Sequence, residues 1–195
     1  MAVALAPAVA RAQAGPEAQA GEIRQHTVAV LGLFEVPTDE PISEVYGSHP
    51  GVAGRYVYRA SESWSIAGDL AYRGPEGETE NFGLEAKLRV LELGAMLRYH
   101  PPLGVSSGAL DLWLGGGVTV QRLEERVSFP GGPLETDDGA AGWLLGAGIE
   151  RLLGRGLGVL ADVRFSRLSI SSGLEGIEDT ELGGFGLLGG VFVSF

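Results

Sequence analysis

The chain has 195 residues, which is long enough for one domain but not for two sizeable cores. It contains no cysteine, which excludes a disulfide scaffold and a thiolate metal site, and its net charge of −11 makes nucleic acid a poor partner. Because the sequence has no apolar run of about eighteen residues, a helical membrane span is not expected, and any span across a bilayer must consist of strands.

The first twenty residues differ in composition from the rest. Residues 1–14 are rich in alanine and end on Ala12-Gln13-Ala14, a site of the kind that signal peptidases cleave, and Ala18-Gln19-Ala20 offers a second site. No lysine or arginine precedes this apolar run. We expect residues 1–20 to be either a partial secretory signal peptide or a disordered leader, and residues 21–195 to form the folded domain.

From His26 onward, segments in which apolar side chains recur at every second residue alternate with polar inserts. A period of two places successive side chains on opposite faces and predicts β-strands. Long inserts at 36–50, 74–85, 122–140 and 169–181 alternate with short connections. The predicted strands cover residues 26–35, where the alternation is blurred, and 52–60, 64–73, 87–99, 109–121, 141–153, 157–168 and 182–195.

One face of the predicted strands is bulky and apolar, and the other is small or charged. In the last strand the apolar row contains Phe185, Val191, Val193 and Phe195, and the opposite row is mostly glycine. A soluble barrel that binds an apolar ligand needs an apolar interior and a polar exterior, whereas these rows indicate the inverse. Strands of about 9–11 residues suit a tilted barrel in a bilayer, where an even strand number and alternating short turns and long loops are typical.

With these features the chain resembles the small eight-stranded outer-membrane barrels of the OmpA and OmpX type, over about residues 26–195. The most specific part of the resemblance is the terminal strand that ends on Val191, Val193 and Phe195. The resemblance implies an all-β, eight-stranded antiparallel up-and-down transmembrane β-barrel in the bacterial outer membrane, surrounded by lipid and lipopolysaccharide. It also implies that the last strand, with Phe185 in the same row, is an assembly signal for the barrel-assembly machinery. We expect a monomer.

The interior of an eight-stranded barrel is just wide enough to be filled by side chains. Charges placed there must be paired, so we expect a closed network of ion pairs, and a gated pore or a proton-titrating site is the alternative. Trp113 falls on the otherwise small face, where it either plugs one end of the interior or marks a wrong face assignment. The predicted interior charges are Arg55, Arg59, Asp69, Glu92, Arg98, Asp111, Glu150, Asp162 and Arg164.

Aromatic residues and charges are both segregated along the predicted barrel. The four long inserts carry all of the net negative charge, which suggests solvated outer loops or loops that bridge to lipopolysaccharide phosphates through divalent cations. Two interfacial girdles of aromatic residues are expected in an outer-membrane barrel. Those near the short turns are Tyr58, Trp64, Tyr99 and Phe195, and those near the long inserts are Tyr72, Trp143 and Phe185.

The sequence offers little support for catalysis, and we expect no cofactor and no metal site. Among outer-membrane barrels are lipid A-modifying enzymes that use Ser and His near the outer rim, and Ser48-His49 is the only neighbouring pair that could serve here. Consecutive residues of a strand point to opposite faces, which counts against this pair. We therefore expect a structural or surface-interaction role through acidic outer loops with an unknown partner, and a narrow pore as the alternative.

Overall fold

The computed structural model describes residues 24–38, 40–78, 84–102, 110–170 and 180–195. The predicted leader, the connection that follows Pro101-Pro102 and most of the last insert lie outside these ranges. The elements of the described part are β1 (His26–Pro37), α1 (Glu40–Tyr46), β2 (His49–Arg59), β3 (Trp64–Arg73), β4 (Glu76–Glu78), β5 (Glu85–Tyr99), β6 (Leu110–Phe129), β7 (Gly132–Gly154), β8 (Leu157–Ile170) and β9 (Thr180–Ser194).

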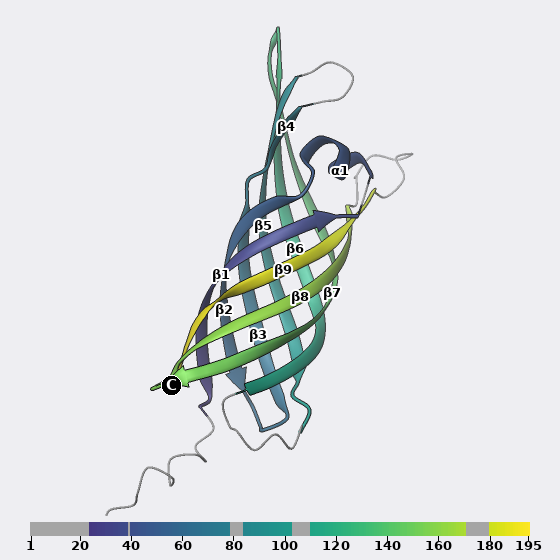
Figure 1. Ribbon diagram of the computed structural model, residues 1–195. Coiled ribbons are helices and arrows are strands. Elements are labelled where there is room, and N and C mark those ends of the chain that lie inside the picture. The colour runs from purple at the N-terminus through teal and green to yellow at the C-terminus, as the bar shows by residue number, and fades with distance from the viewer. Residues whose placement is uncertain (1–23, 39, 79–83, 103–109, 171–179) are drawn as a thin grey trace, which may run out of the picture.

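All of these strands except β4 close into an antiparallel barrel of eight strands, which confirms the predicted fold (Figure 1). Each barrel strand pairs with the next along the chain, and closure comes from β1 against β9, from Thr27 opposite Ser194 to Pro37 opposite Gly184. The short strand β4 pairs with β5 only. We call the end with the short turns, such as the one at Arg155 and Gly156, the turn-side end, and the opposite end the outer end.

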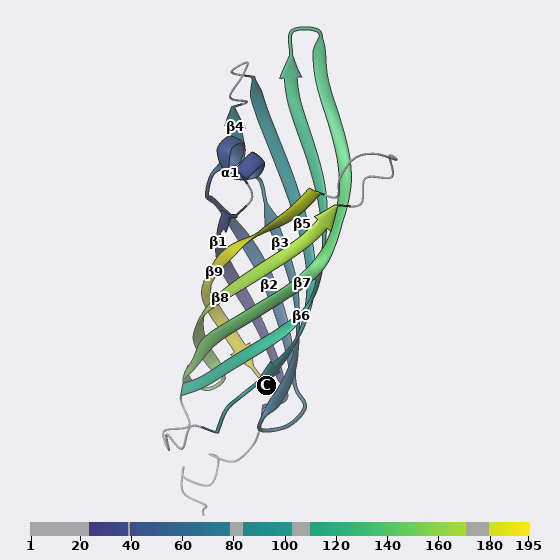
Figure 2. The same ribbon diagram turned by 90° about the vertical axis from the view of Figure 1, so that its right-hand side faces the viewer.

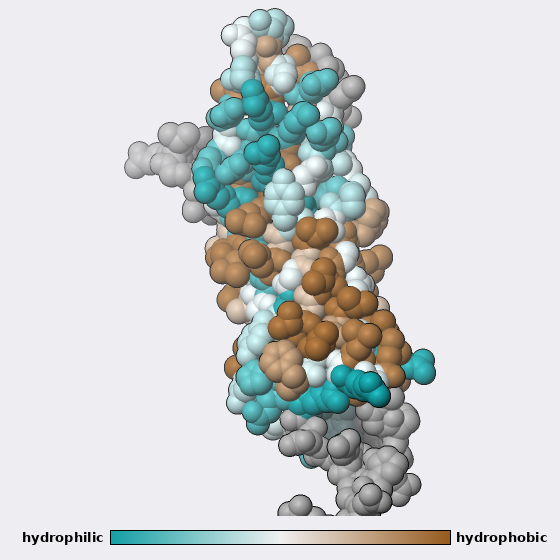
Figure 3. Space-filling view, turned by 90° about the vertical axis from the view of Figure 1, so that its left-hand side faces the viewer, coloured by the Kyte–Doolittle hydropathy of each residue, from teal (hydrophilic) through white to brown (hydrophobic). Residues whose placement is uncertain are grey.

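Inward and outward side chains alternate as predicted. In β3 and β5 every second residue is buried and the residues between them are exposed, apart from half-buried Tyr99 at the end of β5. The alternation is equally strict in β1, which the sequence pattern had shown as blurred: Ala29, Leu31 and Leu33 all point inward. The outward rows form an apolar belt between hydrophilic ends, as Figure 3 shows for one face of the molecule. Among the described residues no helix is long and apolar enough to cross a membrane.

All four predicted loop regions contain regular structure, and there the prediction was wrong: the insert at 74–85 contains β4, and the insert at 169–181 contains the end of β8 and the start of β9. The insert at 36–50 contains α1 and the start of β2, and the insert at 122–140 continues β6 and β7 as a paired hairpin up to Phe129 and Gly132. Figure 2 shows this hairpin projecting beyond the barrel. Its alternation was hidden because outside the membrane the outward row faces water and can be charged, as Arg122 and Glu124 are.

Candidate functional site

The barrel interior is where the predicted site residues meet. All of the predicted interior charges lie on the inward rows, where Arg59, Asp111 and Glu150 are partly exposed and the others are buried. Their ion pairs form three groups along the barrel axis. The groups are the outer network (Glu35, Arg73, Glu92, Arg164 and Gln121), the middle network (Arg55, Asp69, Asp162, Arg98 and Glu150) and the turn-side network (Arg59, Asp111, His100 and Ser65).

In the middle network, two arginines face three carboxylates. Arg55 holds Asp69 in a bidentate pair, with Nε donating to Oδ1 at 2.6 Å and Nη2 to Oδ2 at 2.8 Å, and it also pairs with Asp162. Arg98 donates to Glu150 at 2.9 Å and lies 3.9 Å from Asp162. Because a guanidinium is planar and always charged, it can hold carboxylates on several strands at once. This network therefore ties β2, β3, β5, β7 and β8 together.

Trp113 of β6 lies inside the middle network, so its predicted inward face is correct. Its ring centroid is 3.8 Å from the guanidinium carbon of Arg98 and 5.8 Å from that of Arg55. Space for the ring comes from Gly146 and Gly148 on β7, since a Cβ at Gly148 would lie 2.8 Å from the indole. The missing side chains of these glycines thus make room for an indole that packs against two buried guanidinium groups, and desolvation strengthens such cation–π contacts.

The outer network contains two charges that were not among the predicted interior charges. Glu35 and Arg73, the last residues of two predicted strands, lie at the outer ends of β1 and β3, point inward and form an ion pair. Glu92 accepts from Arg73, from Arg164 (2.9 Å) and from Gln121 (2.9 Å). The parity of the predicted strand 64–73 already indicates the inward face for Arg73, whereas the blurred alternation of 26–35 gave no such signal for Glu35.

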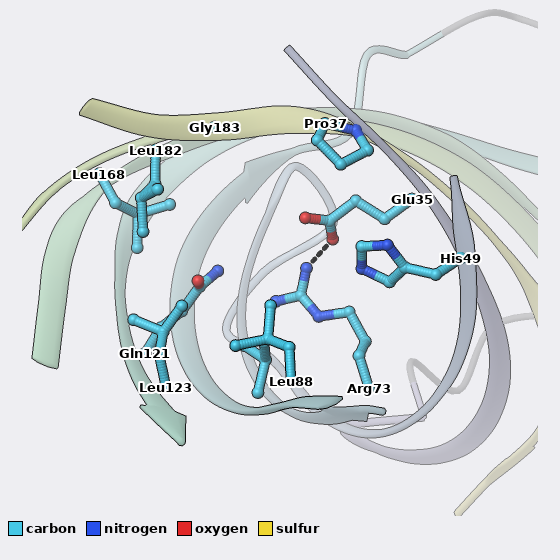
Figure 4. A pocket seen from close by; sticks show the side chains of 11 residues that line it. Glu35, Pro37, His49, Arg73, Leu88, Gln121, Leu123, Leu168, Leu182 and Gly183 are labelled. Carbon is cyan, nitrogen blue, oxygen red and sulfur yellow. Dashed lines mark hydrogen bonds and ion pairs between the residues drawn. The ribbon is translucent and has the colours of Figure 1, made fainter. Parts of the chain in front are cut away.

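Next to the outer network is a cavity of about 30 Å³, which is about the volume of a single water molecule (Figure 4). Glu35, Arg73 and His49 line one side, and Arg73 Nε is buried there without a hydrogen-bond partner. Its other side is lined by Leu88, Val90, Leu123, Leu168 and Leu182, which with Ala140 form an apolar cluster against which Tyr46 of α1 packs. The outer end of the interior is thus filled by apolar side chains above paired charges.

The turn-side network includes an arrangement that the sequence reasoning missed. Ser65 Oγ lies 2.8 Å from His100 Nε2, and His100 Nδ1 lies 3.0 Å from an Asp111 carboxylate oxygen, which also accepts from Arg59 at 2.6 Å. The order Ser, His, Asp is that of a hydrolase triad. Sequence reasoning had no signal for it, because the three residues come from β3, the end of β5 and β6 and are joined only by the barrel.

The pair that the sequence reasoning did single out, Ser48-His49, is not brought together. His49 is buried and points inward, and its Nδ1 lies 3.1 Å from the carbonyl oxygen of Gly47, whereas Ser48 is exposed. In the described part of the chain the two side chains share no hydrogen bond. This outcome follows from their neighbouring positions at the start of β2, which place them on opposite faces.

Both expected aromatic girdles are present on the outside of the barrel. At the outer end the rings of Trp143, Phe165 and Phe185 form a row, with centroids 5.5 Å and 4.9 Å apart. At the turn-side end Trp64 and Tyr99 are 5.1 Å apart, and Phe195 stacks on His26 at 5.8 Å. Phe165 is the one member that the sequence reasoning had not named. Between these rings lies the apolar belt that faces lipid.

Beyond the outer girdle, α1, β4 and the ends of β5, β6 and β7 form a folded outer part. Tyr46 donates a hydrogen bond to Glu125 at 2.5 Å, and burial together with this bond raises the pKa of Tyr46. Arg122 donates two hydrogen bonds to Asp137, at 3.1 Å and 2.6 Å, which lower the pKa of Asp137. Within the described ranges no cluster of three His, Cys, Asp or Glu side chains could hold a metal ion.

Comparison with solved structures agrees with this geometry. The chain is similar to Neisserial surface protein A (TM-score 0.60, 16% identity, 87% of this chain and 97% of that chain). It is also similar to OprG from Pseudomonas aeruginosa (TM-score 0.57, 13% identity, 88% and 95%) and to Ail of Yersinia pestis (TM-score 0.53, 12% identity, 87% and 99%). At these identities the likeness shows the fold.

No curated protein sequence matches the chain. The model of the outer membrane protein beta-barrel domain, however, matches residues 1–187. This match covers nearly the whole chain and agrees with the closed barrel, the lipid-facing belt and the two aromatic girdles. The chain therefore belongs to the family of outer-membrane β-barrel domain proteins of the bacterial outer membrane.

Proposed function

We propose that the protein is a monomeric, non-conducting and non-catalytic surface barrel, in which a closed interior supports an outer part that meets a partner. The observation that carries the proposal is the filled interior. The middle and outer networks cross the interior between strands that are not neighbours, as in the contact of Arg55 on β2 with Asp162 on β8. Above them the apolar cluster and Tyr46 occupy the outer end.

The outer part supports an interaction role because it is folded. Helix α1 packs closely on β4, where a Cβ at Gly77 would overlap with the carbonyl oxygen of Val45. The β6–β7 hairpin carries exposed acids, including Glu135 and Asp137, and two exposed apolar residues, Phe129 and Leu134, near its tip. An ordered surface loses less conformational entropy on binding than a flexible loop does. Exposed acids without an ion pair in the described structure, such as Asp138, would reach phosphates of lipopolysaccharide through divalent cations.

Single-channel recording in planar bilayers tests the closed interior. Protein whose insertion has been verified by heat-modifiable gel mobility should give no conductance above that of the lipid alone. Discrete conductance steps from such a preparation would refute the closed scaffold and favour the narrow pore instead.

The Ser65, His100 and Asp111 arrangement supports a second candidate function, hydrolysis of an ester. Against it stands the burial of Ser65, which has no exposed surface, so that its Oγ cannot reach a substrate in this state. Labelling with a fluorophosphonate probe distinguishes a buried, unreactive Ser65 from a catalytic one. We expect no labelling of the folded barrel, and labelling that is lost in a Ser65→Ala variant would instead establish a reactive serine.

A further inference from the structure

A groove of about 430 Å³ lies beside the hairpin, on the outer part of β5, β6 and β7. Lys87, Arg89, Glu124 and Arg126, which contribute to its lining, belong to the outward rows of β5 and β6, the same rows that face lipid further down. Arg89 and Glu124 are register partners across β5 and β6, as are Lys87 and Arg126. The groove is therefore on the outer surface of the barrel wall, beyond the outer edge of the apolar belt, and does not open into the barrel interior.

The charges of the groove are nearly all neutralised within the protein. Lys87 pairs with Glu76 at 2.9 Å, and Arg126 with Glu135 at 3.6 Å. Arg122, next to the groove, pairs with Asp137 at 2.6 Å and with Glu124 at 3.3 Å.

Two charged side chains that line the groove, those of Glu125 and Arg89, take part in none of these ion pairs. Glu125 accepts the hydrogen bond of Tyr46. Arg89 has no hydrogen bond or ion pair to any residue that the structure describes, and its side chain is exposed. Among the described residues the groove thus presents one guanidinium without an ion pair, that of Arg89, which can bind an anion.

The depth of Arg89 relative to the membrane indicates which anion it can meet. Its neighbour in the outward row is Leu91, which is 48% exposed and is followed by Leu93 at 58%. Leu91 pairs with Tyr72 of the predicted outer girdle. Arg89 comes two residues before Leu91 in β5 and therefore lies closer to the outer end, at most about 7 Å beyond Leu91. The headgroup layer extends roughly 5–8 Å beyond the hydrocarbon on each side of a bilayer, so Arg89 lies at the depth of lipid phosphates.

We propose that Arg89 and the groove around it bind the phosphate group of a phosphorylated lipid of the outer leaflet, whose acyl chains lie against Leu91 and Leu93. A guanidinium forms two parallel hydrogen bonds to a phosphate, and no charge in the groove needs to be displaced to admit one. A free anion would gain nothing from the adjacent apolar row, whereas a lipid uses both features. The site does not depend on the proposed function, because a conducting barrel could carry it equally well.

Binding of diphosphorylated lipid A and of dephosphorylated lipid A to the purified full-length barrel in detergent tests the site. We expect the wild-type protein to bind the phosphorylated form about tenfold more tightly, as the loss of one charge-assisted hydrogen-bonded contact implies. Arg89→Gln should abolish this difference, and Arg89→Lys, which keeps the charge but not the bidentate geometry, should retain part of it. Heat-modifiable mobility verifies that each variant is folded.

Arg151 is the matched control, because it is an exposed arginine in the outward row of β7 at the turn-side end. Arg151→Gln should bind both lipids as the wild type does. Equal binding of the two lipids by the wild type, or an equal loss in both glutamine variants, would overturn the site. Displacement of lipid A by inorganic phosphate at equal concentration would show a free-anion site and would overturn the lipid assignment.

Discussion

The guanidinium of Arg98 lies 3.8 Å from the centre of the Trp113 ring, deep in the barrel, and neither Trp113 Nε1 nor Arg98 Nε has a hydrogen-bond partner in the described structure. The indole is therefore held by packing and by its π face rather than by its N–H group. A desolvated cation–π contact of this kind contributes about 2 kcal/mol. The indole thus contacts Arg98 of β5 and lies against Gly146 and Gly148 of β7.

Replacing Trp113 by alanine should lower the free energy of unfolding by about 3–5 kcal/mol, because a large buried ring is lost and Gly146 and Gly148 leave the space empty. Trp113→Phe keeps an aromatic ring over Arg98 and leaves a smaller cavity than alanine does, and the N–H group it loses bonds to nothing in the described structure, so it should cost less than Trp113→Ala. Urea unfolding in lipid vesicles, followed by gel mobility, measures both. A phenylalanine variant as unstable as the alanine variant would show that an aromatic ring over Arg98 does not stabilise the barrel.

Glu92 is the centre of the outer network, with three donors on β3, β6 and β8. Glu92→Gln should destabilise the barrel by about 3–5 kcal/mol, because it leaves Arg73 and Arg164 to share the single carboxylate of Glu35 in a buried site. Glu124→Gln, an exposed acid on β6, is the control and should change stability by no more than about 0.5 kcal/mol. The same unfolding assay measures both variants. If Glu92→Gln were as stable as Glu124→Gln, the ion pairs of Glu92 would not contribute to the stability of the barrel.

Arg122 and Asp137 join the two strands of the hairpin outside the membrane. Because its folded-state pKa is lowered, Asp137 stabilises the hairpin above the ordinary aspartate pKa of about 3.9, and this contribution is lost as the pH falls through the lowered folded-state pKa. Arg122→Gln removes the cause, so the pKa of Asp137 should rise toward its ordinary value. Carbon NMR of the Asp137 carboxyl group across an acid titration measures this shift. An unchanged midpoint in Arg122→Gln would show that the pair does not form in solution.

The barrel could be predicted because a membrane imposes one rule on every strand: apolar outward and small or polar inward. That rule placed Arg55 and Asp162 inside although 107 residues separate them in the chain. It fails where the membrane ends. At Arg122 and Glu124 the outward row becomes charged, so a regular strand resembles a loop, and the seven residues of α1 are too few for a helical period to be visible.

The pairing within the interior could not be predicted, for a different reason. Parity gives the face of a residue but not its height along a tilted barrel, and height decides which charges meet. Thus Arg98 pairs with Glu150 of β7 rather than with Glu92 of its own strand. The arrangement of Ser65 and His100 depends on the same unknown heights, and so does the position of Arg89 at the edge of the apolar belt.

Phe195 closes the seam between the first and last strands. Its backbone N–H donates to His26 O at 2.9 Å, His26 N–H donates to Phe195 O at 3.1 Å, and the two rings stack at 5.8 Å. The resemblance to outer-membrane barrels also implies that this ring is part of a signal for the assembly machinery. Deletion or Phe195→Ala should therefore reduce membrane insertion in cells.

Two measurements separate the signal from the seam. Refolding of purified protein into lipid vesicles needs no machinery, whereas insertion in cells does. If Phe195 is a signal, Phe195→Ala should reduce insertion in cells much more than it slows refolding into vesicles. His26→Ala removes the ring on which Phe195 stacks but leaves the last strand unchanged, so it should affect both measurements to the same small extent. Normal insertion of the truncated chain in cells, or an equal effect of Phe195→Ala on both measurements, would exclude the signal and leave Phe195 with a packing role only.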